Sequence, residues 1–98
     1  MKKQDKKINL VCTTRISKYR RITEEALKIA KKSIAENKEN EAKEIITMVE
    51  CYLSDSKHFE KQRHYVNSYG CLNYAHGWLD AGARLKVFNV TDNRLFTV

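Results

Sequence analysis

The chain has 98 residues, a formal net charge of +7 and an apolar fraction of 42%. This length suits one small domain over residues 1–98, whose single core would stabilise the fold only modestly, so self-association is a natural supplement. The sequence has no apolar run near the roughly 20 residues that a membrane span needs, and no apolar signal segment follows the charged N-terminus. We therefore expect a cytoplasmic protein with no membrane contact.

The cysteines and histidines do not form a recognisable ligand pattern. Cys12, Cys51 and Cys71 are odd in number and widely spaced, which favours free thiols packed as small apolar side chains over a disulfide framework. Cys51, Asp55 and His58 share one helix face, but they span about 10.5 Å along the axis at 1.5 Å per residue, too far for one small ion. We expect no metal and no cofactor.

Positive charge is concentrated in the first third of the chain. Residues 1–32 hold eleven Lys or Arg against three Asp or Glu, whereas residues 33–98 hold eight against nine. A basic helix of this kind can face nucleic acid. The cations that would contact phosphate are Lys18, Arg21, Lys28 and Lys32.

The same basic segment has a second interpretation as an ordinary solvated helix face. Three carboxylate and cation pairs in it have the i, i+4 spacing of surface ion pairs. They are Arg20 with Glu24, Arg21 with Glu25, and Glu24 with Lys28. If these pairs form, they neutralise much of the basic face, so we keep nucleic-acid binding as the alternative function.

Apolar periodicity predicts three helices in an all-α fold. After a basic arm of residues 1–8, helices are expected over about 9–36, 41–61 and 65–86. Short connections between them predict an up-down-up three-helix bundle. Its core stripes are Cys12, Ile16, Tyr19, Ile22, Ala26, Ala30 and Ser33; Ala42, Ile45, Val49, Tyr52, Ser56 and Phe59; and Leu72, Ala75, Leu79 and Ala83.

The connecting and terminal segments are short. In the polar run of residues 36–40, Asn37 and Asn40 can take the left-handed or capping conformations that a helix-to-helix turn needs. The tail, residues 87–98, alternates like a small hairpin that turns at residues 91–94. Two strands this short are not stable alone, so we expect the extended tail or hairpin to lie on another surface.

The third helix carries an apolar set opposite its core stripe. Projection at about 100° per residue places Cys71, Tyr74, Trp78 and Leu85 on a face that a three-helix core cannot also reach. This set must be covered by the tail or by a second protein chain.

A line containing two glycines runs between these two faces. It comprises Gly70, Asn73, Gly77, Asp80 and Arg84. Each glycine inside a helix costs roughly 0.5 to 1 kcal/mol relative to alanine, so packing or ligand contact must compensate. We expect Gly70 and Gly77 to line a close contact with a neighbouring helix, the tail or a partner. Gly82 points towards the small side of the core, where a close helix contact or a local bend would explain it.

One group on this helix has the residue types of an acid/base site. Tyr69, Asn73, His76 and Asp80 fall within about one face, and an imidazole near a carboxylate is a pair that general acid/base catalysis uses. The i, i+4 spacing of His76 and Asp80 also suits an ordinary structural hydrogen bond, and no nucleophile or phosphate-binding loop accompanies them. We expect no catalytic residue here.

The chain resembles the domain of unknown function 357 family of small archaeal proteins over residues 52–85, YLSDSKHFEKQRHYVNSYGCLNYAHGWLDAGARL. Its core NYAHGWLDAG is the more specific part, and RLFTV at the end is also similar to members of that family. The resemblance implies a short three-helix bundle, an archaeal cytoplasmic protein and no established activity. The residues that match the family's signature are Asn73, Gly77, Trp78, Asp80 and Gly82.

The resemblance also has details that bear on function. Ser54 and Asp55 match a Y-x-S-D start, but residues 62–64, QRH, replace a Gly-Asp turn. The position of His76 accepts tyrosine in the family, which weakens the acid/base interpretation. Some similar helical modules accompany nucleotidyltransferases, which by analogy suggests a helper-subunit role.

Together these patterns predict a non-enzymatic interaction module whose third helix is the working surface. The expected partner is another protein or a second copy of the chain, and the alternative is nucleic acid bound by the basic first helix. The candidate surface comprises Gly70, Asn73, Tyr74, His76, Gly77, Trp78, Asp80 and Arg84.

Overall fold

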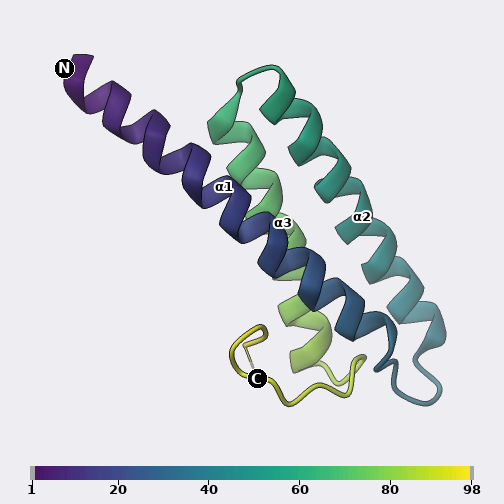
Figure 1. Cartoon of the computed structure of the whole chain (residues 1–98). Coiled ribbons are helices and arrows are strands. Elements are labelled where there is room, and N and C mark those ends of the chain that lie inside the picture. The colour runs from purple at the N-terminus through teal and green to yellow at the C-terminus, as the bar shows by residue number, and fades with distance from the viewer. Residues whose placement is uncertain (1, 98) are drawn as a thin grey trace.

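The computed structural model describes the backbone of residues 2–97 and the side chains of residues 13–97. Three helices follow in order, α1 (Lys2–Lys31), α2 (Glu39–Lys61) and α3 (Tyr65–Arg84), and the backbone described contains no strand. They form the predicted up-down-up bundle (Figure 1). Helix α3 packs closely against both other helices, whereas the backbones of α1 and α2 lie farther apart.

The core follows the predicted stripes and extends into the tail. All four residues of the α3 stripe are buried, because their spacing keeps them on the side that faces α1 and α2. The other helices contribute Ile16, Ala26, Leu27, Ala30, Ala42, Ile45, Val49 and Leu53. The tail adds Val87, Phe88, Leu95 and Phe96.

A partly buried polar cluster links the three helices near the α2–α3 turn. Arg20 of α1 forms an ion pair with Glu60 and donates to Ser56 Oγ at 2.8 Å. The Ser56 and Ser68 hydroxyl oxygens are 2.9 Å apart, and Ser68 Oγ also donates to the Ser56 carbonyl at 2.7 Å. These small hydroxyl side chains let α2 and α3 approach closely while each keeps a hydrogen-bond partner.

The structure differs from the prediction at the start of the first helix and at the end of the turn that follows it. Helix α1 begins at Lys2 rather than near Asn9, and the side chains of the predicted basic arm, residues 1–8, lie outside those described. Asn37 has a left-handed φ of 67°, as expected for the turn. Asn40 lies inside α2 and does not cap it.

The tail crosses the end of α1 and sets where that helix stops. The amide of Ala35 donates to the Val87 carbonyl at 2.9 Å, and the amide of Asn89 donates to the Ser33 carbonyl at 2.7 Å. This short antiparallel bridge includes residues that the apolar periodicity of the sequence assigned to the first helix. Helix α1 therefore ends at Lys31 instead of the predicted residue 36.

Helices α2 and α3 are each followed, two residues after their last helical residue, by a left-handed residue that is not glycine. Arg63 has a φ of 62° and Lys86 a φ of 63°. After each of these residues, the next backbone amide donates a 2.9 Å hydrogen bond to the carbonyl five residues earlier. This bond satisfies a carbonyl at the helix end. Because Lys86 is left-handed, α3 stops at Arg84, before the predicted residue 86.

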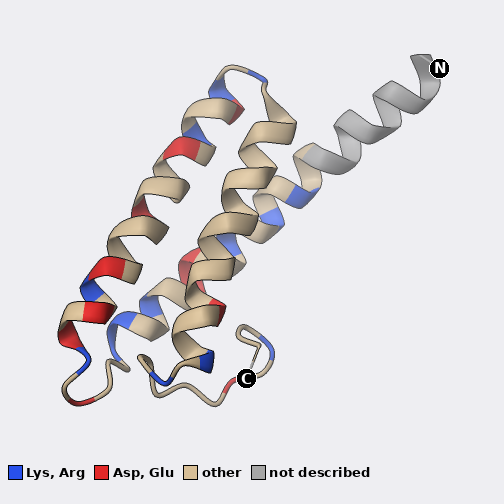
Figure 2. Ribbon diagram, turned by 180° about the vertical axis from the view of Figure 1, so that it is seen from behind, with Lys and Arg blue, Asp and Glu red and all other residues tan. Residues whose placement is uncertain are grey.

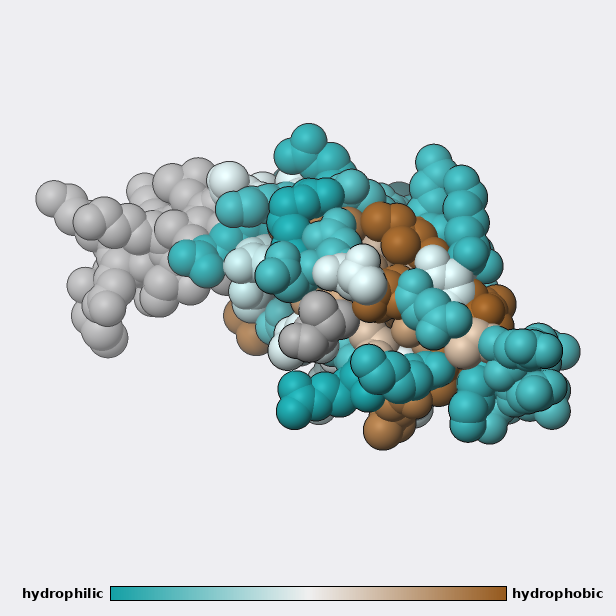
Figure 3. Space-filling model, turned by 90° about the horizontal axis from the view of Figure 1, so that it is seen from below, coloured by the Kyte–Doolittle hydropathy of each residue, from teal (hydrophilic) through white to brown (hydrophobic). Residues whose placement is uncertain are grey.

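Of the two forms expected for the tail, an extended segment or a hairpin, the hairpin does not form. Asp92 makes a turn close to the expected place: its Oδ1 accepts from the amides of Arg94 at 2.8 Å and Leu95 at 3.3 Å, and its carbonyl accepts from the Phe96 amide at 3.1 Å. Residues 87–97 do not pair with one another as strands, because the apolar tail residues insert into the core instead. Figure 3 views this end of the molecule, where hydrophobic residues show between hydrophilic ones.

Gly82 is the glycine that close packing requires. A Cβ atom there would lie 2.5 and 2.7 Å from two ring carbons of Phe88 and 3.1 Å from Ile45 Cδ1. The Phe88 ring is 1% exposed, so it has little room to move away. At Gly70 and Gly77 no atom lies within 4 Å of the Cβ position. The prediction that these two glycines line a close contact inside the chain is therefore wrong.

The same substitution at two glycines of α3 should have opposite effects. Gly82→Ala should lower the free energy of unfolding, since overpacking costs about 1 to 3 kcal/mol and exceeds the gain in helix propensity. Gly77→Ala should raise it by up to about 1 kcal/mol, because propensity acts there unopposed. Urea unfolding of both variants checks this, and equal effects at the two positions would contradict the packing described.

Candidate functional site

The outer face of α3 is apolar and exposed. Val66, Tyr74 and Leu85 are 74%, 65% and 70% exposed, and Trp78 is 37% exposed. Of the two covers expected for this face, the tail does not serve, because it packs at the end of α1 and on the α1-facing side of α3. The face is therefore open to solvent in the single chain.

This surface continues onto α2 through an aromatic pair. The rings of Tyr52 and Tyr74 are stacked, with centroids 5.4 Å apart and an angle of 18° between planes. Tyr52 is half-buried and packs against the core, but its contact with Tyr74 could not be predicted, because the register between two helices is not visible in the spacing of either one. Sequence reasoning missed Val66, although this valine stands off the core stripe at the start of α3 and could have been found by projection.

Six of the eight predicted surface residues share this outer side. A shallow depression of about 250 Å³ lies at its middle, lined by Asn73, Tyr74, Gly77, Trp78 and Ala81. Figure 2 shows that α3 is uncharged over most of its length, in contrast to α2. The six residues are Gly70, Asn73, Tyr74, Gly77, Trp78 and Arg84, and from here on the outer α3 face means these residues together with Val66, Ala81 and Leu85.

His76 and Asp80 instead lie on the side that faces α1 and the tail. His76 Nε2 donates to the Leu95 carbonyl at 2.7 Å, and Nδ1 lies 3.1 Å from Thr23 Oγ1. Because a carbonyl can only accept, Nε2 donates this hydrogen bond, and Nδ1 forms a second one with the Thr23 hydroxyl. Asp80 accepts from the amide and hydroxyl of Thr97 at 2.9 and 3.3 Å. The pair thus holds the tail in place.

A cavity of about 340 Å³ lies beside this tail contact. It is lined by residues of α1 and α3 and by Arg94 of the tail, and the side-chain amide of Asn73, which also lines it, makes no hydrogen bond among the side chains described. Both ring nitrogens of His76 make hydrogen bonds within the chain, to the Thr23 hydroxyl and the Leu95 carbonyl. The cavity is lined by Tyr19, Ile22, Thr23, Leu72, Asn73, His76, Gly77, Asp80 and Arg94.

The basic face of α1 differs from the expected pattern of ion pairs. None of the three predicted i, i+4 pairs forms; the partners come from other elements. Glu24 pairs with Lys57 at 3.6 Å, Glu25 with Arg94 at 3.3 Å, and Arg20 with Glu60. Lys18, Arg21, Lys28 and Lys32 are exposed and make no ion pair with any side chain in residues 13–97.

The thiols that the structure describes are free. Cys51 is exposed and Cys71 is half-buried, while the Cys12 side chain lies outside the described part. Burial, and then the nearby Asp55 carboxylate, raise the pKa of the Cys71 thiol, so it stays protonated and weakly nucleophilic at neutral pH. Among residues 13–97, no three His, Cys, Asp or Glu side chains are placed to hold a metal ion. The described helices also include none that is long and apolar enough to cross a membrane.

Removing the imidazole should loosen the tail. His76→Phe should lower the free energy of unfolding by about 1 to 3 kcal/mol, because the Leu95 carbonyl and the buried Thr23 hydroxyl each lose a partner. The amides of Phe96 and Thr97 should then exchange faster with deuterium. The control is Asn73→Ala on the same helix, which removes no intrachain hydrogen bond. Unchanged exchange in the tail of His76→Phe would contradict the contact.

A comparison with family models matches residues 18–88 to the family described as Protein of unknown function (DUF357). The match covers most of the chain: the described part of α1 from Lys18 onward, all of α2 and α3, and Phe88, which packs on Gly82. Neither a curated protein nor a solved structure matches the chain. By the extent of this match, the chain belongs to the DUF357 family of proteins of unknown function.

Proposed function

We propose that this protein is a non-catalytic interaction module and that its outer α3 face binds a helix of a partner protein. The observation that carries the proposal is an exposed apolar face in a chain of which 32% of the residues are charged. Tyr74, Trp78 and Leu85 give it large side chains that could be buried by a partner. Contiguous apolar surface of this kind marks binding sites on soluble proteins.

The two glycines favour a helical partner. Gly70 and Gly77 are two turns apart on one side of α3, and the space above each is empty. A helix laid along this side could approach the α3 backbone closely, and the contact would offset the roughly 0.5 to 1 kcal/mol that each glycine costs. Tyr74 and Trp78 flank the second glycine and would act as aromatic anchors.

Substitutions on the outer α3 face should abolish partner binding without unfolding the protein. The native protein is used as bait, and a partner that it captures is titrated against Trp78→Ala and Gly77→Leu. Either change should weaken binding by about 30-fold or more, since truncating an anchor or blocking the backbone typically costs at least about 2 kcal/mol.

Lys43→Ala provides the matched control, because Lys43 is exposed on α2 and belongs to no contact described here. Melting curves show that each variant is folded. If the partner binds Trp78→Ala, Gly77→Leu and the control equally well, the outer α3 face is not its site and the proposal fails.

A second candidate function is nucleic-acid binding by α1. The supporting observation is that Glu24 and Glu25 are engaged by Lys57 and Arg94, so they do not pair with the neighbouring cations as expected. The exposed cations Lys18, Arg21 and Lys28 span about 15 Å along α1 at 1.5 Å per residue, and Lys32 follows directly after the helix, enough to follow several phosphates.

Reversing two of these charges should remove that activity. Arg21→Glu combined with Lys28→Glu should reduce the affinity for mixed DNA and RNA by at least about tenfold at low salt, since fewer counterions are released from phosphate. Gel shifts at several salt concentrations measure the affinity and its salt slope. The control Lys43→Glu changes charge on α2 and should have a smaller effect. Unchanged affinity in the double variant would exclude α1 as the binding surface.

A further inference from the structure

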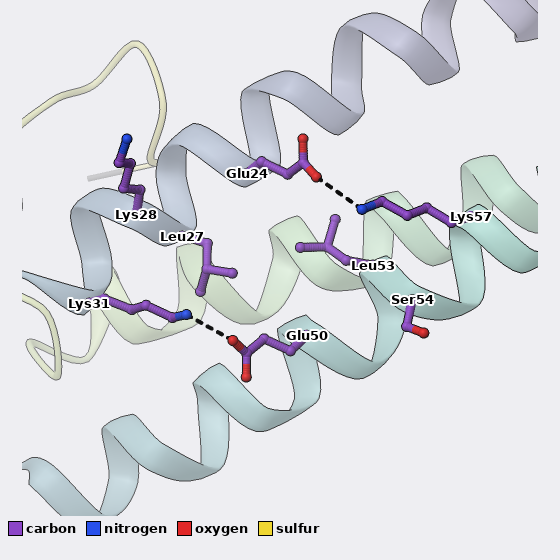
Figure 4. Close-up of a pocket in the computed structure, with 8 residues that line it drawn as sticks. All are labelled: Glu24, Leu27, Lys28, Lys31, Glu50, Leu53, Ser54 and Lys57. Carbon is purple, nitrogen blue, oxygen red and sulfur yellow. Dashed lines mark hydrogen bonds and ion pairs between the residues drawn. The ribbon is translucent and has the colours of Figure 1, made fainter.

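Helices α1 and α2 flank a groove of about 430 Å³. Figure 4 shows it with α3 behind, and with Leu27 and Leu53 pointing towards each other across the gap. These two leucines are 8% and 7% exposed and form an apolar floor. The groove exists because both helices pack on α3 and leave a space between themselves.

Two ion pairs cross this groove, one at each end. Lys57 Nζ lies 3.6 Å from Glu24 Oε2, and Lys31 Nζ lies 2.8 Å from Glu50 Oε2. All four side chains are between 44% and 61% exposed, so their charges also face the solvent.

The same sequence spacing underlies both sides of the groove. Residues 24–31 of α1 and residues 50–57 of α2 each read E-x-x-L-x-x-x-K. Because the two helices run antiparallel, this repeated spacing gives the groove a local two-fold symmetry (Figure 4). Carboxylates and ammonium groups therefore alternate around its four corners, with the two leucines at the centre.

We propose that this face is a contact between two copies of the chain. An alternating pattern of four charges is complementary to the same pattern on a second copy that is related to it by a two-fold axis in the plane of the contact. With a two-fold axis parallel to the helices, Glu24 faces Lys57 of the second copy and Lys31 faces Glu50 of the second copy. Each end of the contact then holds a closed ring of four alternating charges.

Two residues on the outer rims of the groove favour this axis over a two-fold axis perpendicular to the helices. Lys28 lies on the α1 rim and Ser54 on the α2 rim. The parallel axis sets each lysine against a serine, whereas the perpendicular axis would set the two copies of Lys28 against each other. The result is a four-helix arrangement in which α1 and α2 of both copies have antiparallel neighbours.

Charge determines the specificity of this contact, because the two leucines already lie mostly inside the chain. The dimer should therefore weaken as salt is raised. The contact lies on a different surface from the outer α3 face, so it stands or falls independently of the proposed function.

The test exchanges the charges of one ion pair. Glu24→Lys combined with Lys57→Glu keeps an ion pair within each chain and, with the parallel axis, keeps every charge opposite its complement in a dimer of the variant. In a mixed dimer with the native chain, like charges face each other at that end. Sedimentation at low salt should show dimers of each protein, and native mass spectrometry should show mixed dimers at least about tenfold below the statistical share.

A matched control exchanges another exposed ion pair, as Glu25→Arg with Arg94→Glu, and this variant should mix freely with the native chain. A native protein that stays monomeric at low salt up to millimolar concentration would overturn the proposal. If the variant with exchanged Glu24 and Lys57 forms mixed dimers freely with the native chain, the dimer contact lies elsewhere. If the variant no longer dimerises with itself, the perpendicular axis is favoured. Both results contradict the proposed arrangement. Trp78→Ala should leave the dimer intact.

Discussion

The seating of the Phe88 ring on the backbone of Gly82 is the contact on which the rest of the structure depends. It requires that Gly82 has no side chain, and it closes the end of the core where α3 stops. The same turn sends the chain across the end of α1, where its bridge fixes the last residues of that helix. The tail then continues to His76, which binds the Leu95 carbonyl. The Phe88 ring thus positions the ends of α1 and α3 and the tail.

The central place of α3 determines which surfaces are available for binding. Because α3 contacts both other helices, its small residues, such as Ala75 and Ala83, lie at the middle of the core. Helices α1 and α2 are held apart and leave a charged groove on one side of the bundle, while the remaining face of α3 is open and apolar. The fold thus presents two surfaces of different chemistry, one suited to charge recognition and one to apolar packing.

Features that depend on one helix could be predicted from the sequence, and features that depend on two segments could not. The helices and the buried stripe of α3 follow from a 3.6-residue period, which is local information. A close contact, one of the two explanations expected for Gly82, is found there, whereas the contact expected at Gly70 and Gly77 does not form within the chain, because the position of Phe88 is not visible in the spacing of α3. The expected i, i+4 ion pairs failed for the same reason, since carboxylates on α1 found cations on other elements.

The residue spacing of the contacts has a consequence for the order of folding. Helices α2 and α3 are joined by a tight turn at Arg63, so their contacts form within a short loop, whereas Glu25 and Arg94, which link α1 to the tail, are 69 residues apart. Loop closure favours the nearby contacts, and we expect the α2–α3 hairpin to assemble before α1 docks. The end of α1 can therefore be fixed only after residues 87–89, which bind residues 33–35, have folded against it.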